Sequence, residues 1–441
     1  MSETLSRPKA YSGYRLRDVP AEDARLTHVG PGTPCGELMR RYWQPVILSA
    51  ELKDLPVAIR ILGEDLVAFR DGRGRVGVLH RHCCHRGASL EYGRIAEQGI
   101  RCCYHGWHYD IDGTILATPG EPASSRLKDN VVQGAYPTME SQGLVFAYMG
   151  PPESLPAFPH YDVFDIADTE RVPYALHHDC NWLQVHENLM DPWHAVFLHA
   201  RMGEIQLTEA WGEQPVIEWG ELGDRLYYVA SRRLGDNVWV RFNEVALPSF
   251  GQVGGFWEDG LKETLFQRVG ATRWTVPVDD THCWIFGLRH FSDELEAKGI
   301  GNKALVGRDS LDIYGQTGHR PYEEMQRNPG DWEVEVSQRP IAIHALEHRG
   351  STDKGVAMLR RQILRATREP VAPTAAVDGV TPTWTSNTVL RIPARPGGED
   401  EDLLRPVGRA VVEAISGADA LPPAVRIDTI RQALAAIPGR V

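Results

Sequence analysis

The pattern of apolar and polar positions after residue 45 predicts a series of short β-strands. The apolar or β-branched runs are Val57–Leu62, Leu66–Phe69 and Val76–Leu79. The turn-forming segments Gly63-Glu64-Asp65 and Asp71-Gly72-Arg73-Gly74 separate these runs, and Asp112-Gly113 marks a further turn. This part of the chain is therefore predicted to form the hairpins of a small β-sandwich.

A different pattern begins after a proline-dense stretch between Pro151 and Pro159, which places a domain boundary near residue 155. Asn181 to Ala200 is predicted to be helical. The segments predicted as strands are Leu226–Ala230, Val238–Phe242 and Trp284–Leu288. A second, larger domain that mixes helices with strands is expected.

Helices are also expected near both ends of the chain. Thr33 is a helix cap with Pro34 at the first helical position, and this helix is predicted to continue until Pro45 stops it. Ser351 to Asp353 can cap another helix. The apolar face of that helix would hold Val356, Leu359, Ile363 and Leu364.

The sequence after this helix predicts a long connection and then a final helix. Glu369 to Leu403 is rich in Pro, Thr and Gly and includes the acidic run Glu399 to Asp402, so it is predicted to be an exposed loop or arm. The last helix is expected over about 423–437.

Composition narrows the class of protein. The 441 residues include 47 Lys and Arg against 59 Asp and Glu, a formal net charge of −12. This balance argues against nucleic acid or an anionic membrane as a partner. No stretch approaches the roughly 18 consecutive apolar residues of a membrane span, and Met1 to Leu16 has no apolar signal-peptide core. We therefore expect a cytoplasmic protein with no membrane attachment.

The seven cysteines are too few, and odd in number, for a disulfide scaffold, but four of them form two adjacent pairs, Cys83-Cys84 and Cys102-Cys103. Together with His85 and His105 they give the spacing C-x-H-x16-C-x2-H. Two Cys/His pairs at hairpin tips can hold one metal centre. The ligand set alone fits a structural zinc ion or a Rieske [2Fe-2S] cluster equally well.

The residues around the two pairs resemble the cluster-binding loops of Rieske ring-hydroxylating oxygenases. His85-Arg86-Gly87 follows the first cysteines, and Tyr104-His105-Gly106-Trp107 surrounds the second histidine. This resemblance implies that the cluster ligands are Cys83, His85, Cys102 and His105. Cys84 stands where the family usually has proline, and we interpret Cys84 and Cys103 as loop-packing residues that are not ligands.

A second group of metal-binding residue types lies in the predicted helix after Asn181. Glu187, Asp191 and His194 are four and three residues apart and would share one helix face. His199 is five residues beyond His194, so the helix must loosen between them if both are to bind one ion. Pro192 already removes one helical hydrogen bond there.

The pattern E-N-x-x-D-x-x-H-x4-H resembles the mononuclear iron helix of the same oxygenases. It implies that His194 and His199 bind Fe(II) together with one carboxylate, leaving positions open for O2 beside the substrate. It also implies that Asp191 hydrogen-bonds His194 and a neighbouring subunit's cluster ligand His105, which links the two centres. The simpler interpretation of Asp191 is an acid that stabilises a helix N-terminus.

The third iron ligand is less apparent from the sequence. Gly330-Asp331-Trp332 resembles a segment of the phthalate dioxygenase group in which a Gln-Asp pair supplies the carboxylate, although Gly330 replaces the glutamine. This favours Asp331. Asp279 and Asp280, at the end of a predicted strand, are the competing candidates.

The resemblance covers most of the chain and is strongest for oxygenase α subunits of the phthalate dioxygenase type, in the branch that includes aryl-ether O-demethylases and phenoxybenzoate dioxygenases. It implies an α+β protein with three parts. These are an N-terminal segment over 1–45 that packs with the catalytic domain, a Rieske β-sandwich over 46–155, and a mononuclear iron domain over 156–441 with an antiparallel sheet and helices of helix-grip, START-like type.

The resemblance also implies a homotrimer that hydroxylates or O-demethylates an aromatic, carboxylated substrate with O2. No dinucleotide-binding G-x-G-x-x-G loop and no plant-type ferredoxin motif is present in the sequence. Electrons from NAD(P)H are therefore expected to arrive through a separate flavin- or ferredoxin-type reductase. The alternatives are an electron-transfer or structural metalloprotein without oxygenase activity, and a hydrolase with a metal at His194 and His199.

The substrate pocket is expected between the iron helix and the strands over about 205–300. Its possible lining residues are Trp211, Trp219, Trp239, Phe242, Trp257 and Trp284. Most aromatic residues in such strands belong to the core. Arg232, Arg233 and Arg241 could hold a substrate carboxylate, although arginines on strands usually face solvent.

Overall fold

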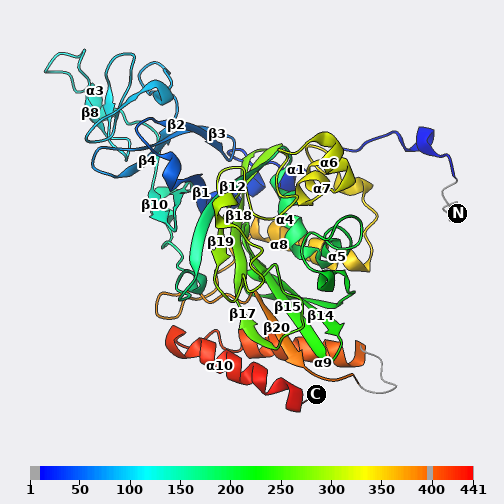
Figure 1. Cartoon of the computed structure of the whole chain (residues 1–441). Coiled ribbons are helices and arrows are strands. Elements are labelled where there is room, and N and C mark those ends of the chain that lie inside the picture. The colour runs from blue at the N-terminus through cyan, green and yellow to red at the C-terminus, as the bar shows by residue number, and fades with distance from the viewer. Residues whose placement is uncertain (1–9, 395–400, 441) are drawn as a thin grey trace.

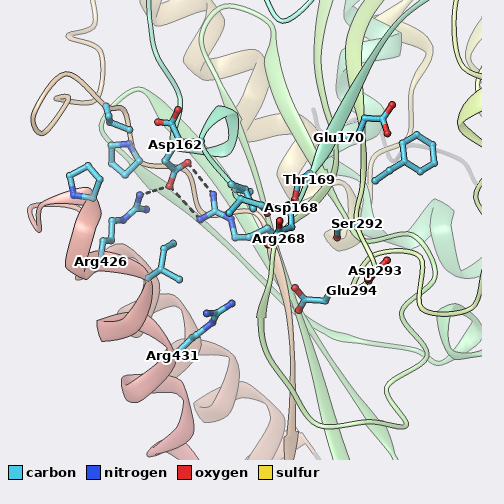
Figure 2. A pocket seen from close by; sticks show the side chains of 18 of the residues that line it. Asp162, Asp168, Thr169, Glu170, Arg268, Ser292, Asp293, Glu294, Arg426 and Arg431 are labelled. Carbon is cyan, nitrogen blue, oxygen red and sulfur yellow. Dashed lines mark hydrogen bonds and ion pairs between the residues drawn. The ribbon is translucent and has the colours of Figure 1, made fainter.

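The computed structural model of the chain describes residues 10–394 and 401–440 (Figure 1). Two small sheets project at one end of the molecule, and a large antiparallel sheet with helices around it forms the rest. The described residues contain no helix that is both long and apolar enough to cross a membrane. This architecture confirms the predicted α+β class.

The small sheets form the sandwich that the hairpin pattern predicts. One sheet has the order β2-β3-β4-β9 and the other has the order β5-β6-β7-β8. Their strands are β2 (Val57–Ile61), β3 (Glu64–Arg70), β4 (Val76–His80), β5 (Arg94–Ile95), β6 (Ile100–Arg101), β7 (His108–Tyr109), β8 (Ile115–Ala117) and β9 (Ala135–Tyr136). Phe69 and Leu79 from one sheet and Tyr109 from the other pack into a common buried core. The short helix α3 (Leu127–Asn130) lies at the outer end.

A three-stranded sheet, β1-β11-β10, lies between the sandwich and the large sheet. Its strands are β1 (Trp43–Leu48), β10 (Thr138–Ser141) and β11 (Leu144–Tyr148). The prediction that the first helix continues to Pro45 is wrong. Helix α2 (Pro34–Arg40) begins after the Thr33 cap as expected but ends five residues earlier, and Pro45 lies in β1 next to a register shift. An irregular strand position tolerates proline because it needs no amide hydrogen bond.

The large sheet has the path β12-β19-β18-β16-β15-β14-β13, and β20 pairs with both β15 and β17. The strands are β12 (Glu170–His178), β13 (Val216–Leu222), β14 (Arg225–Leu234), β15 (Asn237–Ala246), β16 (Phe250–Gly254), β17 (Thr264–Gln267), β18 (Val269–Asp279), β19 (His282–Phe291) and β20 (Ser386–Arg391). The three strand segments predicted from the sequence fall within β14, β15 and β19. Pairing throughout is antiparallel.

Helices cover the large sheet and approach its ends (Figure 1). They are α1 (Ala24–Thr27), α4 (Trp182–Glu187), α5 (Pro192–Phe197), α6 (Tyr322–Arg327), α7 (Asp331–Val336), α8 (Lys354–Ala366), α9 (Glu401–Ser416) and α10 (Pro423–Ala435). The helix expected after Ser351 and the final helix are both present, as α8 and α10. Helix α9 was not predicted, and its buried residues pack with β14 and β15.

The segment from Glu369 to Leu403, predicted to be an exposed loop, instead contributes a strand to the sheet. β20 lies between β15 and β17, and all its residues except Arg391 are buried. The polar side chains of this strand can be buried because they form hydrogen bonds within the sheet. Asn387 donates to Gln267 Oε1 at 2.9 Å and accepts from Trp239 at 3.2 Å. Glu399, in the predicted acidic run, lies outside the described residues, and the end of that run begins α9.

A substitution of Trp384, just before β20, tests whether this segment is buried in the core. Trp384 is 1% exposed, stacks on Phe242 with the ring planes at 9°, and donates its indole N–H to Asp419 at 2.9 Å. We expect Trp384→Ala to lower the free energy of unfolding by about 3–5 kcal/mol because it leaves a cavity. Urea denaturation followed by circular dichroism measures this change.

Arg391→Ala, at the exposed end of β20, is the matched control and should change stability by no more than about 0.5 kcal/mol. Equal, small effects of the two substitutions would indicate that this segment is an exposed loop after all.

Candidate metal centres

Two loops of the small sheets hold the first candidate site, one after β4 and one between β6 and β7. They contain the predicted cluster ligands Cys83, His85, Cys102 and His105. Both loops have the same turn: the amide of Gly87 donates to the carbonyl of Cys83 at 2.8 Å, and that of Gly106 donates to the carbonyl of Cys102 at 3.0 Å. Both glycines have φ in the left-handed region, +75° and +73°, which explains their presence.

At the tips of these loops the two cysteines lie beside each other, and so do the two histidines. Cys83 and Cys102 are 4% and 3% exposed, and burial together with the adjoining Cys83 thiol raises the pKa of Cys102. The ring centroids of His85 and His105 are 4.6 Å apart, and His85 stacks on Trp107 at 4.5 Å. Two thiols on the inner side and two imidazoles on the outer side fit the ligand set of a Rieske [2Fe-2S] cluster.

Tyr109 adds a contact to this site that sequence reasoning missed. Its hydroxyl lies 2.8 Å from Cys83 Sγ and 3.6 Å from Cys84 Sγ, and the residue is fully buried. Burial and the two thiols raise the pKa of Tyr109, so the hydroxyl keeps its proton and can donate. Cys84 and Cys103 are both exposed, but the Cys84 thiol still contacts the buried Tyr109 hydroxyl.

The second candidate site joins two segments that are more than 130 residues apart. His194 Nε2 lies 3.7 Å from Asp331 Oδ1, and His199 Nε2 lies 3.3 Å from the same oxygen. The potential ligand atoms of these three residues all lie within 4.8 Å of one another, a grouping that no other three such side chains share in the described part of the chain. Two imidazoles and one carboxylate form the ligand set of a non-heme iron site.

The competing acids lie elsewhere. Asp279 accepts hydrogen bonds from Thr281 and His282, and Asp280 accepts one from the amide of Val29. Glu187, which shares the predicted helix face, is bound by Arg360 in a buried ion pair. The fold therefore brings Asp331 to the two histidines and keeps these other carboxylates occupied.

The helix predicted over Asn181 to Ala200 is interrupted where the site requires it. α4 ends at Glu187, and a short 3-10 turn leads to Asp191, whose φ of −112° and ψ of 86° are not helical. α5 then ends at Phe197, so His199 lies beyond the helix and can turn toward His194. The ring centroids of the two histidines are 5.3 Å apart, as the predicted loosening requires.

Hydrogen bonds orient each side chain of this site. His199 Nδ1 contacts Gln206 Oε1 at 2.9 Å, and His194 Nδ1 contacts the backbone carbonyl of Asp191. Because both partners are acceptors, each ring donates from Nδ1 and leaves Nε2 free for a metal. Gln316 donates to Asp331 Oδ2 at 2.9 Å. No spacing signal in the sequence points to Gln206 or Gln316.

The electrostatics of the site favour an ionised Asp331 and a neutral His194, whereas His199 is shifted toward its protonated form. Burial alone would raise the pKa of Asp331, but the neighbouring His199 and His194 lower it well below its usual value. Burial lowers the pKa of His194. The pKa of His199 is raised by Asp331 despite burial. A divalent cation would replace the proton that His199 and Asp331 otherwise share.

The carboxylate of Asp191 caps α5. It accepts from the amide of Trp193 at 3.0 Å and lies 4.0 Å from Nδ1 of His194. The side chain is 32% exposed, so part of it faces outward from the site. The carboxylate therefore caps the helix, and it is the backbone carbonyl of Asp191, not the carboxylate, that contacts His194 Nδ1.

A cavity of about 80 Å³ adjoins the three potential ligands; we call it the iron cavity. Of the aromatic residues proposed as lining, it contains Trp211, whereas Trp219, Trp239, Phe242, Trp257 and Trp284 lie outside its wall. Most of its wall is apolar. Polar groups enter from Tyr228, Arg241, Asn243, Arg273 and Gln316.

Arg241 is the unusual member of this wall. It is 2% exposed, contrary to the expectation that strand arginines face solvent, and its guanidinium lies 4.4 Å from the Trp211 ring. Its hydrogen bonds are long, 3.3 Å to Asn387 Oδ1 and 3.4 Å to the carbonyl of Gly255, and it has no ion pair within residues 10–394 and 401–440. Burial lowers its pKa. Arg232 is also buried but lies outside the iron cavity.

Comparison with known proteins agrees with this geometry. A model of the Rieske [2Fe-2S] domain matches residues 42–137. The oxygenase subunit named tert-butanol monooxygenase / tert-amyl alcohol desaturase, from Aquincola tertiaricarbonis, is 47% identical over 94% of this chain and 93% of its own length. The phenoxybenzoate dioxygenase α subunit of Ectopseudomonas oleovorans is 39% identical over 82% and 89%.

Among solved structures, the oxygenase of carbazole 1,9a-dioxygenase in its reduced complex with ferredoxin has a similar fold. Its TM-score is 0.54 at 19% identity, with coverage of 76% of this chain and 92% of that one. The fold, the two Cys/His loops and the group of His194, His199 and Asp331 together fit a terminal oxygenase component. The chain belongs to the Rieske oxygenases and is related to their α subunits of the phthalate and phenoxybenzoate dioxygenase type. The oxygenase prediction is thus favoured over the electron-transfer alternative.

The contact between Tyr109 and Cys83 predicts a measurable redox effect. A hydroxyl that donates to a cluster sulfur stabilises the more negative, reduced state. We expect Tyr109→Phe to lower the midpoint potential of the cluster by about 20–65 mV, the equivalent of one hydrogen bond for one electron. Redox titration followed by circular dichroism measures it.

Tyr104→Phe is the control because Tyr104 is 57% exposed and no hydrogen bond links its hydroxyl to the described residues. An unchanged potential in Tyr109→Phe would show that the hydroxyl does not donate to the cluster.

Proposed function

We propose that Cys83, His85, Cys102 and His105 hold a Rieske [2Fe-2S] cluster, and that His194, His199 and Asp331 hold one Fe(II). The observation that carries the second assignment is the approach of the three ligand atoms to within 4.8 Å of one another beside a cavity. When bound, the cluster would supply single electrons and the ferrous ion would activate O2 next to the substrate. The chain's own residues orient both histidines, exclude water from the iron cavity and position the substrate.

We further propose that the working unit is a homotrimer in which Asp191 of one subunit meets His105 of the next. In Figure 1 the small sheets project at one end of the molecule, whereas α5 lies beside the large sheet. A neighbouring subunit would bring the two centres together. The 32% exposure of Asp191 and the exposed position of His105 leave both side chains available for this contact.

The domain limits 1–45, 46–155 and 156–441 remain part of this proposal, as does a cytoplasmic location. A flavin- or ferredoxin-type reductase is proposed to deliver electrons from NAD(P)H. Support comes from the carbazole oxygenase, whose structure was solved in complex with ferredoxin.

For the substrate we propose a compact, branched alcohol. The iron cavity of about 80 Å³ is smaller than the roughly 150 Å³ cavity that binds benzene in another protein. Its wall is largely apolar, with a few hydrogen-bonding groups for one oxygen. The relative that is 47% identical is named for tert-butanol and tert-amyl alcohol, which are molecules of this size.

An aromatic carboxylate, the substrate class expected from the sequence, is the second candidate. The observation that favours it is Arg241, whose buried guanidinium without an ion pair would bind a carboxylate strongly. Phenoxybenzoate, named for the second relative, belongs to this class. Arg241 would also donate to an alcohol oxygen, so turnover must distinguish the two candidates.

The iron assignment predicts the effect of Asp331→Ala. Without the carboxylate, two imidazoles should bind Fe(II) far more weakly, while the cluster loops are unaffected. We expect about one iron fewer per chain, an unchanged visible spectrum of the cluster, and loss of at least 99% of product formation. Metal analysis and electron paramagnetic resonance of the reduced protein measure this.

Asp279→Ala is the matched control and should keep its full iron content, because Asp279 bonds Thr281 and His282 instead. Iron loss from Asp279→Ala with full retention in Asp331→Ala would refute the ligand assignment.

The substrate proposal is tested with the trimer reconstituted with both metal centres, NADH and a surrogate reductase. We expect tert-butanol to be hydroxylated to 2-methylpropane-1,2-diol, with a kcat/KM at least tenfold above those for 4-methoxybenzoate and 3-phenoxybenzoate. Gas chromatography detects the diol, and a formaldehyde assay detects O-demethylation. A reversed preference, abolished by Arg241→Gln, would establish the aromatic acid instead.

A further inference from the structure

A second, larger cavity lies on the opposite face of the large sheet from the iron cavity. Successive residues of a strand point to opposite faces, and on β18 Arg273 lines the iron cavity whereas Trp274 lines the second one. The second cavity measures about 590 Å³, within the range of small-molecule sites. It therefore does not belong to the catalytic site.

A proline-rich segment, residues 370–381, covers this second cavity and is tied to the body at two points. The amide of Thr381 donates to the carbonyl of His160 at 2.7 Å, and the amide of Thr374 donates to Asp224 Oδ1 at 2.9 Å. The attached segment encloses the cavity between itself and the sheet.

Aromatic rings form one part of the wall, beside proline and aliphatic side chains. The rings belong to Trp43, Phe146, Phe158, Tyr161, Phe250 and Trp274. Tyr161 stacks on Phe250 with centroids 4.4 Å apart, and Phe146 meets Phe158 edge to face at 5.0 Å. These contacts hold the rings in place, so the wall is a preformed surface for apolar contact.

One end of the cavity is polar. The hydroxyls of Tyr42 and Tyr161 have no hydrogen-bond partner among the described residues, and both side chains line the cavity with Asp224. Burial and the charge of Asp224 raise the pKa of Tyr42 to about 12, and burial raises the pKa of Tyr161. Both hydroxyls are therefore protonated donors, and Asp224 is an acceptor beside them.

Charges of both signs meet at this end of the cavity. Asp224 disfavours an anion, and the Arg225 guanidinium is paired through Nη1 with Glu244 at 2.9 Å, while its buried Nε has no partner among the described residues. Arg41 and Arg225 at the same end disfavour a cation. A ligand hydroxyl can form hydrogen bonds with the groups at this end, because it can accept from a tyrosine hydroxyl and donate to the Asp224 carboxylate.

We propose that this second cavity is a binding site for a neutral apolar molecule that carries one hydroxyl group, of one or two rings in size. The aromatic wall holds the apolar body, and Tyr42, Tyr161 and Asp224 bind the hydroxyl. The site is separate from oxygenation and would be occupied at the same time as the iron cavity.

The test measures binding to the holoenzyme without reductant, so no turnover occurs and the result does not depend on the proposed substrate. The probes are 1-naphthol and 1-methoxynaphthalene, which share the ring system but differ in the hydroxyl donor. Isothermal titration calorimetry should show one site per chain for 1-naphthol, with about threefold to tenfold weaker binding of the methoxy compound, the effect of losing one hydrogen bond.

Variants locate the site. Tyr42→Phe/Tyr161→Phe should weaken 1-naphthol about threefold to tenfold and narrow the difference between the probes, while Ala157→Trp, at an exposed position of the cavity wall, should block both probes. Tyr228→Phe, in the wall of the iron cavity, is the matched control and should bind 1-naphthol normally. No binding, equal affinity for the two probes, or a loss confined to Tyr228→Phe would overturn the proposal.

Discussion

The approach of Asp331 to two imidazoles is the constraint on which the rest of the structure depends. It joins α7 to the segment around α5, although the two are far apart in the chain, and it places one carboxylate oxygen within 3.7 Å of both rings. Such proximity needs a helix that stops after Phe197 and a break at Asp191. It also needs Gln206 and Gln316 to hold His199 and Asp331 in place.

The large antiparallel sheet allows these segments to meet and separates two cavities of different character. The iron cavity on one face is small, with Arg241 as a buried cation in its wall. The second cavity on the other face is larger and aromatic, with neutral hydroxyls and a carboxylate at one end. Because neighbouring residues of a strand alternate between faces, β18 contributes side chains to the walls of both cavities, and the two cavities stay separate.

Buried polar groups within the sheet are another consequence of this arrangement. Burying the Arg241 guanidinium without a carboxylate partner costs free energy. The cation–π contact with the Trp211 ring, at 4.4 Å, offsets only part of this desolvation cost. Asn387 of β20 serves a different purpose, since it bonds Gln267 and Trp239 and thereby holds a polar strand inside the sheet. The Arg241 guanidinium can therefore bind a ligand, whereas the Asn387 side chain stabilises the sheet.

The sequence by itself determined the features that depend on local spacing. These are the hairpins of the sandwich, the Thr33 cap, the strands within β14, β15 and β19, and the pairing of cysteines with histidines in two loops. Resemblance added the preference for Asp331. Only the tertiary structure decided what depends on distant contacts. Asp279 is hydrogen-bonded to His282, the Tyr109 hydroxyl contacts Cys83 Sγ, and residues 386–391 form the strand β20. Local pattern cannot predict these because burial of a polar residue depends on partners that the fold brings from elsewhere in the chain.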